Sequence, residues 1–189
     1  YFSKSSTSIM TINWGDGTSS TSTTVGNQTL THTYTAAGSY IIKIDNSNGG
    51  TWSFQNSSCF QGTYQHIVTT AYLGSNILSV GRAFYLNYNL TTLSVGRNNS
   101  VWQLIYGCRS LVSFVHYGGN TGGSFAEGCY SLKNVCLKQN VNLTGTFNFA
   151  YCYGLRKIIL PDAATTIDTG TFNSCFALKK LNCKNVTTV

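Results

Sequence analysis

The sequence predicts a mainly β protein in which a small β-sandwich-like unit is followed by a solenoid of about five coils. Three observations support this fold class. A short apolar pattern returns every 21 to 23 residues in the second half of the chain. The first third shows the alternation and turns of antiparallel strands. One proline in 189 residues and a hydrophobic content of 42% argue against a disordered chain.

The repeat begins with a cysteine or an asparagine that is followed three residues later by leucine. Its five copies begin at Asn87, Cys108, Cys129, Cys152 and Cys175. In each copy the third residue after the leucine is apolar, and the fifth residue is also expected to point inward. The fifth residue is His116 in the second copy and Cys183 in the last. The resulting L-x-x-L-x-L pattern is the strand of a leucine-rich repeat, with alternate side chains pointing inward. One coil cannot bury these residues alone, but stacked coils can.

The last two coils carry the most regular copies of the repeat. They read Phe149-Ala-Tyr-Cys152-Tyr-Gly-Leu155-Arg-Lys-Ile158-Ile-Leu160-Pro161, then Ile167, then Phe172-Asn-Ser-Cys175. This pattern resembles the BspA-type leucine-rich repeats, whose coil is roughly F-x-x-C-x-x-L-x-x-I-x-L-P, then I, then the next F. The resemblance covers about residues 77–189. It implies a leucine-rich-repeat solenoid and an association with bacterial surface attachment to host proteins and other cells.

The first 48 residues predict a separate antiparallel β-unit. Residues 9–14 alternate like a strand, Gly15-Asp16-Gly17-Thr18 forms a turn, and a further strand is expected over residues 39–44. The pair W-G-D-G-T and H-T-Y-x-x-x-G-x-Y resembles a PKD-type, immunoglobulin-like extracellular module. Such modules are longer, so the unit is either truncated at Tyr1 or a minimal β-unit docked on the solenoid. We expect three regions, namely this unit in residues 1–48, a linker and degenerate first coil in 49–76, and the solenoid in 77–189.

The composition limits the classes of function. Only 9% of the residues are charged, and Ser, Thr, Asn and Gly supply the polar surface, which favours an extracellular or virion setting. No apolar run is long enough to span a membrane. A net charge of +7 favours an acidic partner, but no nucleic-acid-binding motif accompanies it, so we expect no specific nucleic-acid binding. The chain starts without Met, and we expect a processed product or a fragment.

No catalytic constellation is present in the sequence, so we predict neither an enzyme nor a cofactor. Asp16 is expected to cap its own turn, with calcium binding as the alternative. His116 is expected to be a core histidine whose ring nitrogens are satisfied by hydrogen bonds. The chain has seven cysteines and no C-x-x-C pair. We call the four cysteines that begin a copy of the repeat the column cysteines. They are predicted to be free, buried thiols, with disulfides or a zinc site as the alternatives.

Two columns of residues on the last three coils are candidate ligand-binding positions. In each of these coils the residue directly after the column cysteine is aromatic. The residue directly after the leucine is cationic, and in the last two coils the next residue is cationic too. The predicted ligand-binding residues are Tyr130, Tyr153, Phe176, Lys133, Arg156, Lys157, Lys179 and Lys180. Rings stack on sugars, and cations bind sulfate, carboxylate or phosphate. The alternative is that the rings pack on neighbouring coils and the cations only solvate the surface.

These observations lead to the hypothesis of an extracellular recognition or cell-adhesion module that binds a cell-surface protein or an anionic glycan. A structural or receptor-binding protein of a phage virion is the first alternative, and an accessory binding domain of an enzyme is the second. The sequence ends without a polar element that would cap the last strand. We therefore also expect a further repeat, a flanking domain or a homo-oligomer contact at the C-terminal edge.

Overall fold

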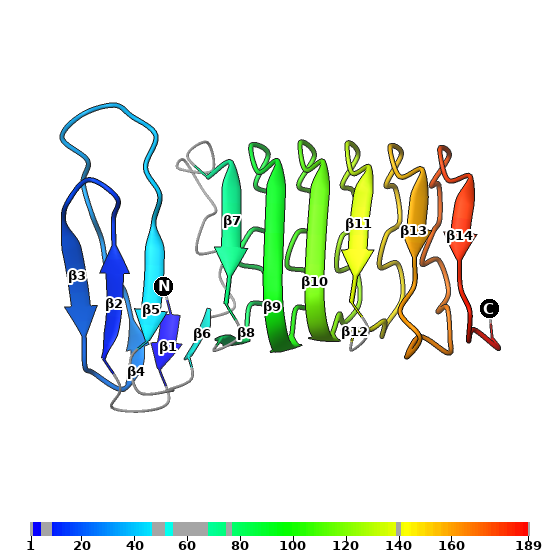
Figure 1. The fold of residues 1–189 in the computed structure, drawn as a ribbon, viewed down its shortest axis with the longest axis horizontal. Helices are drawn as coiled ribbons and strands as arrows, with labels where there is room; N and C mark the ends of the chain where they lie inside the picture. Colours follow the sequence, from blue (N-terminus) through cyan, green and yellow to red (C-terminus); the bar gives the residue numbers. More distant parts are fainter. Residues whose placement is uncertain are drawn as a thin grey trace.

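The computed structural model describes residues 2–4, 9–46, 52–54, 68–74, 77–138 and 141–188. Among these residues it contains strands and turns but no helix, so the predicted fold class is confirmed. A small antiparallel sheet lies at the N-terminal end, and a row of parallel strands runs from it to the C-terminus (Figure 1). Most of the predicted linker and part of the predicted degenerate coil, residues 47–51 and 55–67, lie outside the described residues.

One side of the solenoid is a parallel sheet with one strand from each coil. Its strands are β7 (Thr70–Leu73), β9 (Thr92–Ser100), β10 (Ser113–Asn120), β11 (Asn134–Leu137), β13 (Lys157–Ile159) and β14 (Lys180–Asn182). The predicted register is confirmed, because Leu93 pairs with Phe114, Phe114 with Val135, and so on to Leu181. β14 is the outermost strand of this sheet. The partner expected at this edge stays a prediction.

A second side carries shorter ladders that connect the solenoid to the N-terminal region. The ends of β9 and β10 pair with β8 (Ile77–Ser79) and β12 (Val141–Asn142), respectively. β8 also pairs with β6 (Trp52–Phe54), and β1 (Phe2–Lys4) lies antiparallel between β6 and β4 (Gly26–Gln28). These strands and those of the parallel side belong to one 11-stranded sheet, so backbone hydrogen bonds connect the solenoid to β1 and β4 of the N-terminal region.

The third side is a layer of tight turns that we call the turn layer. Its backbone N–H groups donate to carbonyls of the next coil, as in the bonds from Phe84 to Leu104 (3.1 Å) and from Ala126 to Asn148 (2.8 Å). Each coil places two residues with positive φ in this layer. These left-handed positions are Arg82 and Leu86, Gln103 and Gly107, Ser124 and Gly128, Phe147 and Tyr151, and Gly170 and Ser174. Most of these residues are not glycine, so their left-handed conformation could not be predicted from the sequence.

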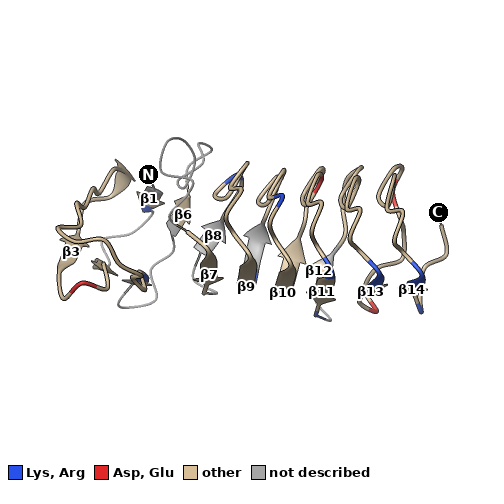
Figure 2. Cartoon of the chain, turned by 90° about the horizontal axis from the view of Figure 1, so that it is seen from above, with Lys and Arg blue, Asp and Glu red and all other residues tan. Residues whose placement is uncertain are grey.

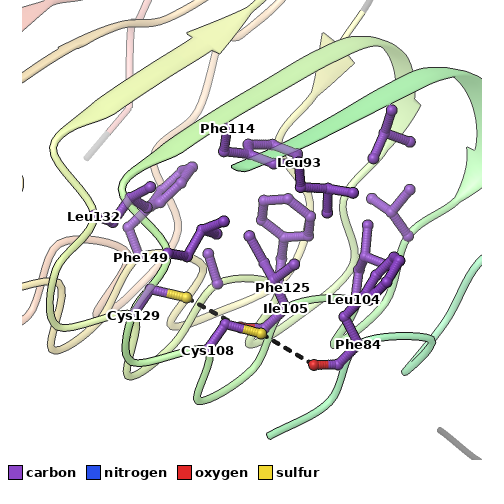
Figure 3. Close-up of a cluster of buried hydrophobic side chains, with 14 of the residues drawn as sticks. Phe84, Leu93, Leu104, Ile105, Cys108, Phe114, Phe125, Cys129, Leu132 and Phe149 are labelled. Atoms are coloured by element: carbon purple, nitrogen blue, oxygen red, sulfur yellow. Dashed lines mark hydrogen bonds between the residues drawn. The ribbon is translucent and has the colours of Figure 1, made fainter. Parts of the chain in front are cut away.

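The column cysteines point into the core, where they are free thiols as predicted. Each thiol donates to a carbonyl of the preceding coil, from Cys108 to Phe84 at 3.0 Å and from Cys129 to Ile105 at 3.0 Å. Figure 3 shows the first of these bonds among the buried leucine and phenylalanine side chains. Burial raises the pKa of the Cys108 thiol to about 12, which keeps it neutral.

The last coil departs from the predicted burial. Cys183 was expected to point inward, but it is exposed, and the side chain of Leu181 is 38% exposed. Cys175 is only half-buried. Among the described residues β14 pairs with β13 alone, so its inward positions are covered from one side only.

The N-terminal unit is a three-stranded antiparallel sheet in which β2 (Met10–Asn13) lies between β3 (Ser19–Ser22) and β5 (Lys43–Asn46). The strand expected over residues 39–44 begins only at Lys43. The predicted turn is confirmed, with Asp16 accepting hydrogen bonds from the N–H and hydroxyl of Thr18 at 3.0 and 2.7 Å. His32 bonds the other Asp16 oxygen at 2.7 Å and stacks on Trp14. The resemblance to a PKD-type module stays a prediction.

Candidate binding surfaces of the solenoid

Five cations line the edge where the turn layer meets the parallel sheet. We call this set the cationic strip, and it consists of Lys133, Arg156, Lys157, Lys179 and Lys180. All five side chains are exposed. The strand register places Lys157 directly beside Lys180, and the N–H of Lys179 donates to the carbonyl of Arg156 at 3.0 Å. In Figure 2 the blue positions mark the strip at β13 and β14.

The charges of the strip are not neutralised within the described part of the chain. Its ion pairs are Asp16–His32 and a 4.0 Å contact between Asp162 and Lys184, and neither includes a strip residue. Neighbouring strands lie about 4.8 Å apart, so Lys157 and Lys180 repel each other at short range. An anion placed between them would relieve this repulsion.

Beside the strip, the outer face of β10, β11 and β13 forms an open groove of about 480 Å³. Val115, Cys136 and Ile159 are neighbours in register and form its apolar floor. Lys133 and Lys157 belong to its lining, so the groove adjoins the strip. This groove was not predicted from the sequence, although apolar residues at outward strand positions, such as Val115 and Ile159, were the available signal.

The three predicted aromatic residues are brought together, and their rings stack on each other. Tyr130 and Tyr153 stack at 4.9 Å between ring centroids, and Tyr153 and Phe176 stack at 5.6 Å. The stack extends in the other direction through Arg109, whose guanidinium lies 5.3 Å from the Tyr130 ring centroid and 5.1 Å from that of Tyr88. The faces of the Tyr130 and Tyr153 rings are therefore largely used within the protein, whereas Phe176, at the end, is 83% exposed.

The described residues include no group of three or more His, Cys, Asp or Glu side chains that could hold a metal ion. A helix able to cross a membrane is likewise lacking in this part of the chain. His116 is fully buried, as predicted, but neither ring nitrogen has a hydrogen-bond partner among the described residues, so the expectation of a satisfied histidine was wrong. Burial lowers the pKa of His116 to about 4, so its ring is neutral at physiological pH.

Comparison with known families supports the repeat assignment. Residues 121–189 match the family model described as BspA type leucine rich repeat region (6 copies). The match includes the whole cationic strip and the three aromatic residues. No curated protein matches the chain, and no solved structure matches it. Residues 121–189 are thus similar to leucine-rich repeats of BspA type.

Proposed function

We propose that this protein is an extracellular recognition or adhesion module that binds an acidic partner through the cationic strip. The partner is an anionic glycan or an acidic cell-surface protein. The observation that carries the proposal is the alignment of five exposed cations, without ion pairs to described residues, on three successive coils. Such an arrangement concentrates positive potential along one line, which attracts polyanions and positions them.

The geometry of the strip favours an extended ligand. Three coils span about 10 Å, so an extended polyanion can place successive sulfate or carboxylate groups over successive coils. The groove adjoining the strip offers an apolar floor to the uncharged part of such a ligand. The extracellular setting is supported by the low charge content and by the repeat family. Nothing in the described residues specifically favours the phage-virion alternative.

The proposal is tested with heparin as a sulfated-glycan probe. Lys157→Glu inserts a negative charge in the centre of the strip, and Lys43→Glu makes the same change on β5 of the N-terminal sheet, where Lys43 is exposed. We expect Lys157→Glu to weaken heparin binding about tenfold or more at low salt, because a charge-assisted contact is replaced by repulsion between the new carboxylate and the polyanion. Lys43→Glu should change it less than about threefold. Equal losses in the two variants would show that net charge alone attracts heparin.

A further inference from the structure

The turn layer contains a hollow of about 390 Å³ that none of the strip residues lines. It lies at the second left-handed position of four successive coils. In order along the solenoid this position is Leu86, Gly107, Gly128 and Tyr151. Leu86 and Tyr151 have φ values of 56° and 58°, so this backbone position accepts side chains. The two glycines therefore leave an open floor, and the flanking leucine and tyrosine side chains line its two ends.

The floor could accommodate a side chain at one of its two glycines. A Cβ atom on Gly128 would meet its nearest neighbours at 3.6 to 3.9 Å, which is ordinary contact. A Cβ atom on Gly107 would lie 2.5 Å from the Leu86 side chain, which reaches over that residue. The hollow is thus open at Gly128, and a larger residue there would fill it.

The walls are aromatic rings that are held by their neighbours. Tyr106 stacks on Tyr85 at 5.0 Å, which fixes its ring on one side. On the other side, Tyr130 and Tyr153 belong to the aromatic stack, and Tyr151 meets the Tyr153 ring edge-on at 6.4 Å. Because these rings are packed before any ligand arrives, binding does not require them to become ordered.

Two opposite charges face the same hollow without forming an ion pair. Arg109 and Glu127 both line it, and no ion pair joins either of them to another described residue. The Arg109 guanidinium is held between Tyr88 and Tyr130. A purely anionic ligand would be repelled by the carboxylate, and a purely cationic ligand by the guanidinium.

We infer that this hollow is a binding site for a neutral sugar residue of a glycan. Sugar hydroxyl groups both donate and accept hydrogen bonds, so they can satisfy Glu127, Arg109 and the tyrosine hydroxyls together. The apolar part of a sugar ring can pack against Tyr106 and Tyr151, while Tyr130 and Tyr153, whose ring faces are occupied in the aromatic stack, contribute their edges and hydroxyl groups. The volume lies within the range of small-ligand pockets. Burial, followed by the nearby Glu127, raises the pKa of Tyr106, so its hydroxyl stays a donor.

The test uses mannan, laminarin, galactan and chitin oligosaccharides as neutral probes, with binding to the intact chain measured by calorimetry. We expect at least one probe to bind with Kd below about 1 mM. Glu127→Gln removes the charge but keeps the side-chain shape, and Gly128→Asn fills the floor with a residue that tolerates positive φ. Glu127→Gln should weaken that binding about tenfold, the value of one hydrogen bond to a charged group. Gly128→Asn should weaken it at least as much, because its side chain occupies the space of the ligand.

The outcomes separate this site from the cationic strip. Lys157→Glu should leave neutral-glycan binding within about twofold, because Lys157 does not line the hollow. Urea unfolding of each variant verifies that it is folded. The inference is overturned if no neutral probe binds, or if binding persists unchanged in both Glu127→Gln and Gly128→Asn. Loss of heparin binding in Lys157→Glu is independent of either result.

Discussion

At the scale of single residues, His116 shows what the core of the solenoid tolerates. Its column contains Val95, Leu137 and Leu160 in other coils, all of them buried. The imidazole packs near the rings of Phe114 and Phe125 without a hydrogen bond to either nitrogen. A buried polar group without a partner destabilises the native state, and protonating it in the core is more unfavourable still.

We therefore expect the fold to lose stability in mild acid through this residue. The pKa of His116 is lowered from 6.5 to about 4 in the native state. Above pH 6.5 the ring is neutral in both the native and the unfolded state, so its protonation does not affect stability. As the pH falls from 6.5 toward 4, the unfolded state takes up a proton that the native state does not. The free energy of unfolding then decreases by up to about 1.4 kcal/mol per pH unit. His116→Leu, which copies the neighbouring coils, should remove this part of the pH dependence. Urea unfolding between pH 7.5 and 4.5 measures it, and parallel curves for the two proteins would contradict the account.

Thiol reactivity is a second prediction at this scale. Cys136 and Cys183 are exposed, whereas Cys108, Cys129 and Cys152 are buried. Burial also raises the pKa values of the column thiols, to about 12 for Cys108, so little reactive thiolate forms. A disulfide reagent should modify Cys136 and Cys183 rapidly in the native protein and the three buried thiols only after unfolding, as read by peptide mass mapping. Rapid native modification of Cys129 would refute the assignment of the column to the core.

At the scale of the elements, the strands could be predicted from the sequence and the turn layer could not. Inward and outward side chains alternate strictly along a strand, so a repeated L-x-x-L-x-L pattern fixes which positions stack. The turns instead take their conformation from hydrogen bonds to the next coil. Phe147 and Tyr151 consequently adopt positive φ values of 58°, although their local preference opposes it. Both the hollow and its glycines were missed for this reason.

The close approach of coils in the turn layer gives a stability prediction. A Cβ atom on Gly145 would lie 2.6 Å from the backbone nitrogen of Gly123, and its φ is 79°. Gly145→Ala should therefore destabilise the protein by about 2–4 kcal/mol, from left-handed strain together with the clash. Gly74→Ala is the matched control, because a Cβ atom there meets nothing within 4 Å and its φ is not positive. Similar urea midpoints for both variants would show that the coils are packed less closely.

At the scale of the whole molecule, the same register that builds the core also aligns the surface. The strand pairing that stacks Ile158 on Leu181 places Lys157 beside Lys180 on the outer face. The stacking of the aromatic residues was predicted as an alternative to ligand binding, and their ring contacts follow from the same repeat. The sequence could not show which outward cations lack an ion-pair partner, because that depends on where the carboxylates lie in the folded protein.

The central claim is that the cationic strip is the surface that meets an acidic partner. Lysine acetylation of the native protein, with and without heparin, tests it most directly when each site is quantified by mass spectrometry. We expect heparin to slow the modification of Lys133, Lys157, Lys179 and Lys180 several-fold, because bound sulfates cover their ammonium groups. Lys43, on the N-terminal sheet, should react at an unchanged rate. Equal protection of Lys43 and the strip lysines, or no protection of the strip, would contradict the account.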